Sequence, residues 1–331
     1  MRWRQGTKSG TPFMSDLPRI VFLDRGAFSV AVRPRRIEVA CEWIDHNATP
    51  PEMVRERLLE ATAAITVNVP LGPTDLDGID SLKFISVCSS GLNHVDLDYC
   101  RDHGIEVAGV AGYASQTVAE HAMALLLAVK RGLVGYVRDM DAGTWARSGR
   151  HSLPIHPVGD LHGLRLGVVG SGAIGETLAR IASGFGMQVL RAGRKGAVEV
   201  PPGRTAFEEV IATADVISLH CPLTPETAGL IGEIEFAAMT RRPVIINTAR
   251  GALIDEAALV RALAEDRIAG AGLDVVSSEP IAADNPLNAL IGDPRFVLTP
   301  HVGWSGDRAQ QALYDGGVDN VLAFLARQAY R

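Results

Sequence analysis

The chain has 331 residues, which is long enough for two or three domains with a buried core. Hydrophobic residues make up 47% of it and charged residues 21%, as is typical of a soluble globular protein. A net charge of −6 argues against nucleic acid as the main partner, because such a protein binds phosphate backbones poorly. Apolar runs stay short of the roughly 18 residues that a membrane helix needs, so we also expect no membrane association.

Residues 1–13 are basic and polar without an apolar core, and therefore do not resemble a signal peptide. Met14 is a candidate natural start, and we expect the residues before it to be loosely held. The cysteines show neither metal-ligand nor redox-motif spacing; they are Cys41, Cys88, Cys100 and Cys221. Scattered cysteines are typical of a reducing compartment, so we expect a cytoplasmic protein with no metal site.

Short apolar runs alternate with helical patterns along the chain, which predicts parallel sheets. In the first part, strands are expected at 19–23, 63–67, 83–87 and 105–108, with helices at 52–60 and 96–103. A mostly apolar helix follows at 115–131 and should be buried. The glycine- and arginine-rich segment 132–163 has little strand pattern, and we interpret it as an arm or long connection.

The alternation restarts at Leu164, with strands expected at 164–169, 188–192, 216–220, 244–247, 269–274 and 295–298. A last helix is expected at 308–326. We therefore predict two α/β units, each a doubly wound parallel sheet, with the second inserted into the first. The expected boundaries are 15–113 with 305–331 for one domain and 114–304 for the other.

The motif GSGAIG at 170–175 lies between an apolar strand and a helical pattern. Gly170 permits a tight turn, Gly172 lets the backbone approach a pyrophosphate, and Gly175 allows the helix to pack closely on the strand. Ala173 and Ile174 open the helix, whose free N–H groups and positive dipole end suit phosphates. The motif in this context predicts a dinucleotide-binding loop.

The next strand ends at Gly193-Arg194-Lys195, where NAD-binding proteins usually carry an acidic residue for the ribose hydroxyls. Without that carboxylate, Arg194 and Lys195 can make charge-assisted contacts to a 2′-phosphate. The alternative is that both cations belong to a solvated turn. We favour NADP(H) as the cofactor and keep NAD(H) as possible.

Three later strands are each followed by a polar side chain suited to hydride-transfer chemistry: Arg250, Glu279 and His301. The carboxyl ends of parallel strands share one edge of a sheet, so we expect these residues to converge. His301 can donate a proton to a carbonyl that accepts hydride, with Glu279 orienting it. Arg250 can bind a substrate carboxylate. Taken singly, each residue also has a structural alternative. Arg250 could form a surface ion pair, Glu279 could cap a loop, and His301 could be a hydrogen-bonded histidine in a turn.

From about Pro18 onward the chain resembles the D-isomer-specific 2-hydroxyacid dehydrogenase family, which shares the segment CPLTPET at 221–227 and the later arginine, glutamate and histidine in this order. The resemblance implies a Rossmann dinucleotide-binding domain inserted into a flavodoxin-like substrate domain. It implies Arg250 as the substrate-binding residue, His301 with Glu279 as the acid/base pair, and Asp274 as the contact of the nicotinamide amide. Further cofactor contacts are expected from Thr117, Cys221, Pro222, Thr227, Thr248, Ala249 and Gly303.

The segment SSGLNHVD at 89–96 is similar to the family loop whose backbone amides hold the substrate carboxylate, which implies Ser90, Gly91 and Leu92. An ordinary strand-to-helix turn is the alternative. The family resemblance also implies a homodimer, with the arm and the 115–131 helix as candidate interface.

Three features are similar to the glycerate dehydrogenase or hydroxypyruvate reductase branch: AGYA at 111–114, ADNPL at 283–287, and Trp304. We therefore expect an enzyme that reduces hydroxypyruvate or glyoxylate to the D-hydroxy acid. The alternative is a dinucleotide-sensing binding protein or corepressor on the same fold. A pure sensor does not need Arg250, Glu279 and His301 together, so their presence favours the enzyme.

Overall fold

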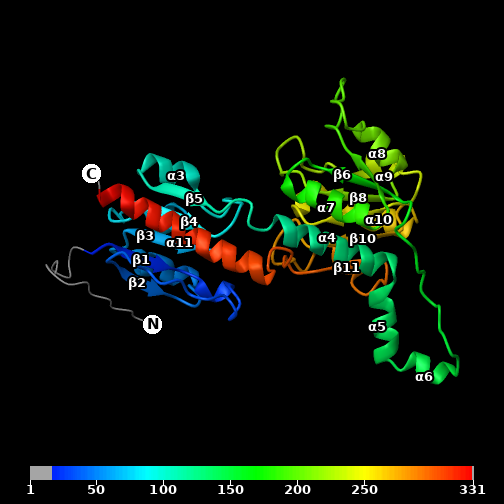
Figure 1. Ribbon diagram of the computed structural model, residues 1–331, viewed down its shortest axis with the longest axis horizontal. Helices are drawn as coiled ribbons and strands as arrows, with labels where there is room; N and C mark the ends of the chain where they lie inside the picture. Colours follow the sequence, from blue (N-terminus) through cyan, green and yellow to red (C-terminus); the bar gives the residue numbers. More distant parts are fainter. Residues whose placement is uncertain (1–16, 330–331) are drawn as a thin grey trace. The chain divides into compact units, whose positions relative to one another are not determined.

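The computed structural model describes residues 17–329 (Figure 1). The chain divides into two compact units. Residues up to Tyr113 and those from Ser305 form unit 1, and Ala114–Trp304 form unit 2. The expectations for residues 1–13 and Met14 lie outside the described residues. Within the described part, no helix is both long enough and apolar enough to cross a bilayer.

Unit 1 is built on a parallel five-stranded sheet in the order β2-β1-β3-β4-β5, which is the flavodoxin-like order. The strands are β1 (Arg19–Phe22), β2 (Glu42–Asp45), β3 (Ala63–Thr66), β4 (Phe84–Val87) and β5 (Glu106–Gly109). The sequence did not predict β2. This edge strand buries only Trp43, whereas all residues of the central strand β3 are buried and give the apolar run that we looked for.

Helices cover both faces of this sheet. The helices α1 (Val54–Leu58), α2 (Pro73–Leu76) and α3 (Leu97–Asp102) contribute to one core with the strands. The C-terminal helix α11 (Asp307–Ala329) covers β4 on its other side, where the rings of Phe84 and Phe324 stack with centroids 4.8 Å apart. The chain therefore returns to unit 1 at its end.

Unit 2 holds a parallel six-stranded sheet in the order β11-β10-β9-β8-β6-β7. Its strands are β6 (Arg165–Val169), β7 (Gln188–Arg191), β8 (Val216–Leu219), β9 (Val244–Asn247), β10 (Gly270–Leu273) and β11 (Phe296–Leu298). The winding direction reverses at β6, which has β7 on one side and β8 on the other. Open α/β sheets bind ligands at such a switch point, beyond the carboxyl ends of the strands.

The helices of unit 2 form two layers around the sheet. One core joins α4 (Ser115–Lys130) and α7 (Ala173–Gly184) to the strands, and the other joins α8 (Phe207–Thr213), α9 (Glu233–Ala238) and α10 (Glu256–Ala264). In β9, Val244 and Ile246 belong to the first core and Ile245 to the second. This alternation is what a strand buried on both faces requires.

The segment 132–163, interpreted from the sequence as an arm or long connection, contains no strand but includes the helices α5 (Leu133–Asp141) and α6 (Thr144–Ser148), which the sequence did not predict. Gly132, Gly143 and Gly149 adopt φ values of 60°, 66° and 63° and mark the ends of these helices. The glycines therefore separate short helices instead of preventing them. Figure 1 shows α5 and α6 projecting away from the sheet of unit 2.

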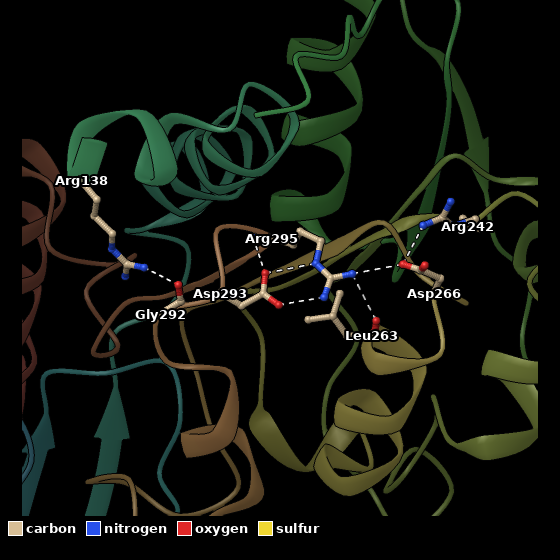
Figure 2. Close-up of polar contacts among 7 residues, drawn as sticks. All are labelled: Arg138, Arg242, Leu263, Asp266, Gly292, Asp293 and Arg295. Carbon is tan, nitrogen blue, oxygen red and sulfur yellow. Dashed lines mark hydrogen bonds and ion pairs between the residues drawn. The ribbon is translucent and has the colours of Figure 1, made fainter. Parts of the chain in front are cut away.

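A polar network holds the segment that leads into β11 (Figure 2). Arg295 binds Asp293 through Nη2 and Oδ2 at 2.8 Å and Asp266 through Nη1 and Oδ1 at 3.1 Å. Arg138 of α5 donates to the carbonyl of Gly292 in the same segment. These contacts hold the amino end of β11 in place. They thereby help to position the turn that follows β11, which carries His301.

Candidate active site

Two glycines of the loop after β6 lie where a side chain would clash with the backbone. Gly170 has φ +116°, and an ideal Cβ there would lie 2.4 Å from the carbonyl carbon of His220. A Cβ on Gly175 would lie 2.4 Å from the Gly170 oxygen. In contrast, a Cβ on Gly172, the N-cap of α7, would meet nothing within 4 Å. Side chains are thus excluded where the loop packs, and open space remains where the helix begins.

The residues around this loop fit a nicotinamide dinucleotide. The N-terminus of α7, with Ala173 and Ile174 as its first residues, offers amides to phosphates. Thr248, just after β9, has a buried Oγ1 without a hydrogen-bond partner among the described residues. A buried hydroxyl left unsatisfied is costly and points to a missing ligand contact.

Other predicted cofactor residues lie near the carboxyl end of the same sheet or in the first turn of α4. The Thr227 hydroxyl donates to the Pro222 carbonyl at 2.7 Å and accepts from the Thr224 amide at 2.7 Å, which closes the turn after β8. Cys221 lies two residues after the end of β8, and Thr117 is the third residue of α4. No described contact tests their cofactor roles, which stay predictions.

Cations gather where β7 ends, but most of them already have partners. Arg191 binds Glu176 of α7 with Nη2 and Oε2 2.9 Å apart, which lowers the pKa of Glu176. Lys195 differs from our expectation of a cation open to phosphate, because its Nζ lies 2.7 Å from Oε1 of the buried Glu235. Arg194 is exposed, and no carboxylate in residues 17–329 pairs with it.

The turn after β9 presents Arg250. Asn247, the buried last residue of the strand, donates from Nδ2 to the Arg250 carbonyl at 2.8 Å and accepts from the Ala249 amide at 3.0 Å. The Arg250 guanidinium donates to the Ala249 carbonyl at 2.7 Å and forms no ion pair within the described part of the chain. Its charge is therefore available to an anionic ligand. Asn247 was not among the predicted site residues, although a polar residue at the end of an apolar strand is a signal for such a role.

Glu279 and His301, which are far apart in the sequence, are in direct contact. His301 Nδ1 lies 2.6 Å from Glu279 Oε2. Glu279 Oε1 also accepts from the Val276 amide at 3.2 Å. His301 has a φ of 53°, a left-handed conformation that histidine adopts more readily than most residues. Because Nδ1 faces the carboxylate, Nε2 is the ring nitrogen left to act on a ligand.

Asp274 is buried after β10, and its expected contact with the nicotinamide stays a prediction. Its side chain is 2% exposed and accepts hydrogen bonds from Thr299 Oγ1 at 2.6 Å, from the Val302 amide at 2.9 Å and from the Gly303 amide at 2.7 Å. Burial alone would raise the pKa of Asp274, but these bonds and one from His121 outweigh it and lower the pKa. The carboxylate therefore builds the turn that carries His301.

In unit 1, the predicted substrate loop follows β4. The Gly91 amide donates to Ser89 Oγ at 3.1 Å, and Ser90 Oγ donates to the Val110 carbonyl at 3.2 Å. Leu92 accepts from the Val95 amide at 3.0 Å through its carbonyl. The loop is thus an ordered strand-to-helix turn, and its role toward substrate stays a prediction.

The four cysteines are free thiols. Within the described part of the chain, no group of three or more histidine, cysteine or acidic side chains is arranged to hold a metal ion.

The three candidate catalytic residues of unit 2 follow β9, β10 and β11, which are neighbours in the sheet. Arg250, Glu279 and His301 therefore come from three adjacent strand ends at one edge.

A dinucleotide-type glycine loop and a histidine in contact with a carboxylate on the same sheet are typical of one class of oxidoreductases. The chain belongs to the D-isomer specific 2-hydroxyacid dehydrogenase family, whose NAD binding domain matches residues 123–303.

Particular relatives align over nearly the whole chain. A putative 2-hydroxyacid dehydrogenase of Haemophilus influenzae is 38% identical over 93% of this chain and 98% of its own. A glycerate dehydrogenase of Methylorubrum extorquens is 38% identical over 93% and 96%. Among solved structures, a protein of Thermus thermophilus is 36% identical with a TM-score of 0.77, covering 93% of this chain and 97% of its own.

Proposed function

We propose that the protein reduces a small 2-oxo acid of the hydroxypyruvate or glyoxylate class to the D-2-hydroxy acid, using NADPH or NADH. The 2.6 Å contact between His301 and Glu279, on the sheet that carries the dinucleotide loop, is the observation on which this rests. The similarity to a glycerate dehydrogenase supports the substrate class, because oxidation of glycerate at C2 gives hydroxypyruvate.

A reduced nicotinamide, when bound, would supply the hydride for the carbonyl carbon. Protonated His301 donates a proton from Nε2 to the carbonyl oxygen, so that hydride and proton together convert C=O to CH–OH. Glu279 holds Nδ1 and stabilises the positive imidazolium before this transfer. Arg250 pairs with the substrate carboxylate and favours negative charge on the reacting oxygen.

We assign the binding tasks to the two units by the same reasoning. Unit 2, with the glycine loop, is the dinucleotide-binding domain. Unit 1 is the substrate-binding domain, in which Ser90, Gly91 and Leu92 offer backbone groups to the substrate carboxylate. Oxidation of NADPH or NADH by the purified protein in the presence of hydroxypyruvate tests this activity, and its absence with every 2-oxo acid would refute it.

We further propose NADP(H) as the preferred cofactor, with Arg194 as the main contact of the 2′-phosphate. Lys195 contributes less, because Glu235 already neutralises it at 2.7 Å. A charge-assisted hydrogen bond contributes about 1.5–3 kcal/mol, so Arg194→Ala should lower kcat/KM for NADPH about ten- to hundredfold while that for NADH stays unchanged. Lys195→Ala is the matched comparison and should have the smaller effect.

Steady-state kinetics with both cofactors check this assignment. Equal losses for NADPH and NADH in Arg194→Ala would show that the arginine does not recognise the phosphate. A wild-type preference for NADH would refute the NADP(H) proposal itself.

We also propose a homodimer formed through the arm. Leu133, Val137 and Met140 of α5 are 49%, 59% and 52% exposed, and Trp145 of α6 is 44% exposed. Apolar side chains that gather on one projecting segment are typical of an interaction surface. We expect light scattering to give twice the 35.2 kDa chain mass for the wild type and a single chain mass for Val137→Glu. A wild-type monomer at micromolar concentration would contradict the proposal.

A further inference from the structure

We propose that Glu256, a buried carboxylate at the start of α10, is a positioning residue that holds the loop bearing Glu279 and so keeps Glu279 in contact with His301. The inference rests on the proposed function, since it assigns Glu256 a task in the acid/base chemistry of that pair. Glu256 itself acts only through the loop 275–285.

Glu256 binds this loop near both of its ends. Its Oε1 accepts from the Ser277 amide at 2.6 Å, and its Oε2 accepts from Ser277 Oγ at 2.7 Å and from Asn285 Nδ2 at 2.8 Å. The Glu256 residue is only 8% exposed. A buried carboxylate is costly unless donors surround it, and here all these donors come from the one loop.

The loop needs such an anchor. It contains neither helix nor strand between residues 275 and 285, and residues 277–280 are exposed. The Glu279 and His301 side chains are themselves 37% and 43% exposed. An ion pair this open to water contributes only about 0–1 kcal/mol, less than the entropy lost on ordering even a few residues. The loop backbone must therefore hold Glu279 at 2.6 Å from His301. Glu256 can do this through Ser277, which lies two residues before Glu279.

The same anchor links Glu279 to the segment of Arg250. An ideal Cβ on Gly251 would lie 1.9 Å from the carbonyl carbon of Val276, so the backbone after Arg250 lies directly against the loop. Glu256 follows in this segment, at a helix start fixed by the Asp255 side chain, which accepts from the Ala258 amide at 2.9 Å. Close packing and the Glu256 hydrogen bonds together fix the position of the loop 275–285 relative to the segment 250–256.

The direction of these hydrogen bonds, with Glu256 as acceptor and Asn285 as donor, allows a specific test. Asn285 Oδ1 accepts from the Leu287 amide at 2.9 Å, so its Nδ2 must face Glu256. In Glu256→Gln, the new amide oxygen is needed by the Ser277 amide, and its NH2 group then opposes the NH2 group of Asn285. Adding Asn285→Asp removes that conflict, because an aspartate can accept both from the introduced NH2 group and from the Leu287 amide.

The experiment compares the wild type, Glu256→Gln, Asn285→Asp and the double variant. Glu233→Gln is the control, since Glu233 also opens a helix of unit 2 but is 51% exposed and pairs with Arg261. Small displacements of catalytic groups cost up to about a hundredfold, so we expect kcat of Glu256→Gln to fall about ten- to hundredfold. The Kd of NADPH should stay unchanged, and the double variant should recover most of kcat.

Hydrogen–deuterium exchange gives a second readout that needs no turnover. Peptides covering 275–285 should exchange faster in Glu256→Gln and return to the wild-type rate in the double variant. An unchanged kcat in Glu256→Gln, or a lowered thermal midpoint with normal kcat per folded molecule, would overturn the proposal. So would a double variant no better than the single one. A wild type without turnover would instead refute the proposed function.

Discussion

Replacing His301 with asparagine is expected to lower kcat/KM for hydroxypyruvate reduction about 10²–10⁴-fold, which is the usual contribution of a general acid. Asparagine tolerates the left-handed backbone that His301 adopts, with φ of 53°, so the turn should survive. The variant loses Nε2 as a proton donor and also the 2.6 Å contact between Nδ1 and Glu279. Binding of NADPH, which depends on the glycine loop, should be unchanged.

The control is His103→Asn, at the C-cap of α3 in unit 1, which should keep full activity. Measurements of kcat/KM and of NADPH binding by fluorescence titration separate the chemical step from cofactor affinity. Activity close to the wild type in His301→Asn would remove His301 from the mechanism. Loss of NADPH binding in parallel with activity would instead indicate a structural defect.

Replacing Arg250 with lysine is the second change for which we expect a large effect, with kcat/KM for the 2-oxo acid lowered about 10²–10³-fold. The guanidinium can bind a carboxylate through two parallel hydrogen bonds, and an ammonium group cannot. Within the described part of the chain, Arg250 donates only to the Ala249 carbonyl at 2.7 Å, so its charge is not already neutralised. The loss should appear in KM for the substrate as well as in kcat.

Arg261→Lys is a suitable comparison, because Arg261, on α10, is half-exposed and pairs with Glu233 of α9. Steady-state kinetics at saturating NADPH would show the difference. If Arg250→Lys kept the KM of the wild type for hydroxypyruvate, the substrate carboxylate would have to bind elsewhere.

Much of the fold follows from the sequence because its central strands are buried on both faces and therefore appear as apolar runs. The edge strand β2 lacks such a run, since only Trp43 of its residues is buried. The arm was harder to predict, because Gly132, Gly143 and Gly149 suggest a loop although they only end short helices. Boundaries elsewhere differ by one to three residues, and differences of this size are expected where helix and strand ends fray.

The candidate site was predictable where a charged or histidine side chain follows a predicted parallel strand, as Arg250, Glu279 and His301 do. The structure brings Glu279 and His301 into contact. What the sequence does not show is which side chains bind distant backbone. Glu256 contacts Ser277 21 positions away, and no local pattern marks that pair.

The same limit applies to the contacts of two expected cofactor residues. Lys195 is expected to contact a 2′-phosphate, and its Nζ also pairs with Glu235, at the start of another helix. Asp274 is expected to contact the nicotinamide, and its carboxylate also accepts hydrogen bonds from Thr299 and from the amides of Val302 and Gly303. Both sets of partners lie far along the chain, so only the fold reveals them.

The central claim is that this protein turns over a 2-oxo acid with a reduced nicotinamide. The most direct test is the loss of NADPH absorbance when the purified protein is mixed with hydroxypyruvate, repeated with glyoxylate and with NADH. The proposed function predicts steady oxidation that yields D-glycerate from hydroxypyruvate and is lost in His301→Asn. Tight dinucleotide binding without turnover of any 2-oxo acid would contradict it and would favour a dinucleotide-sensing protein on the same fold.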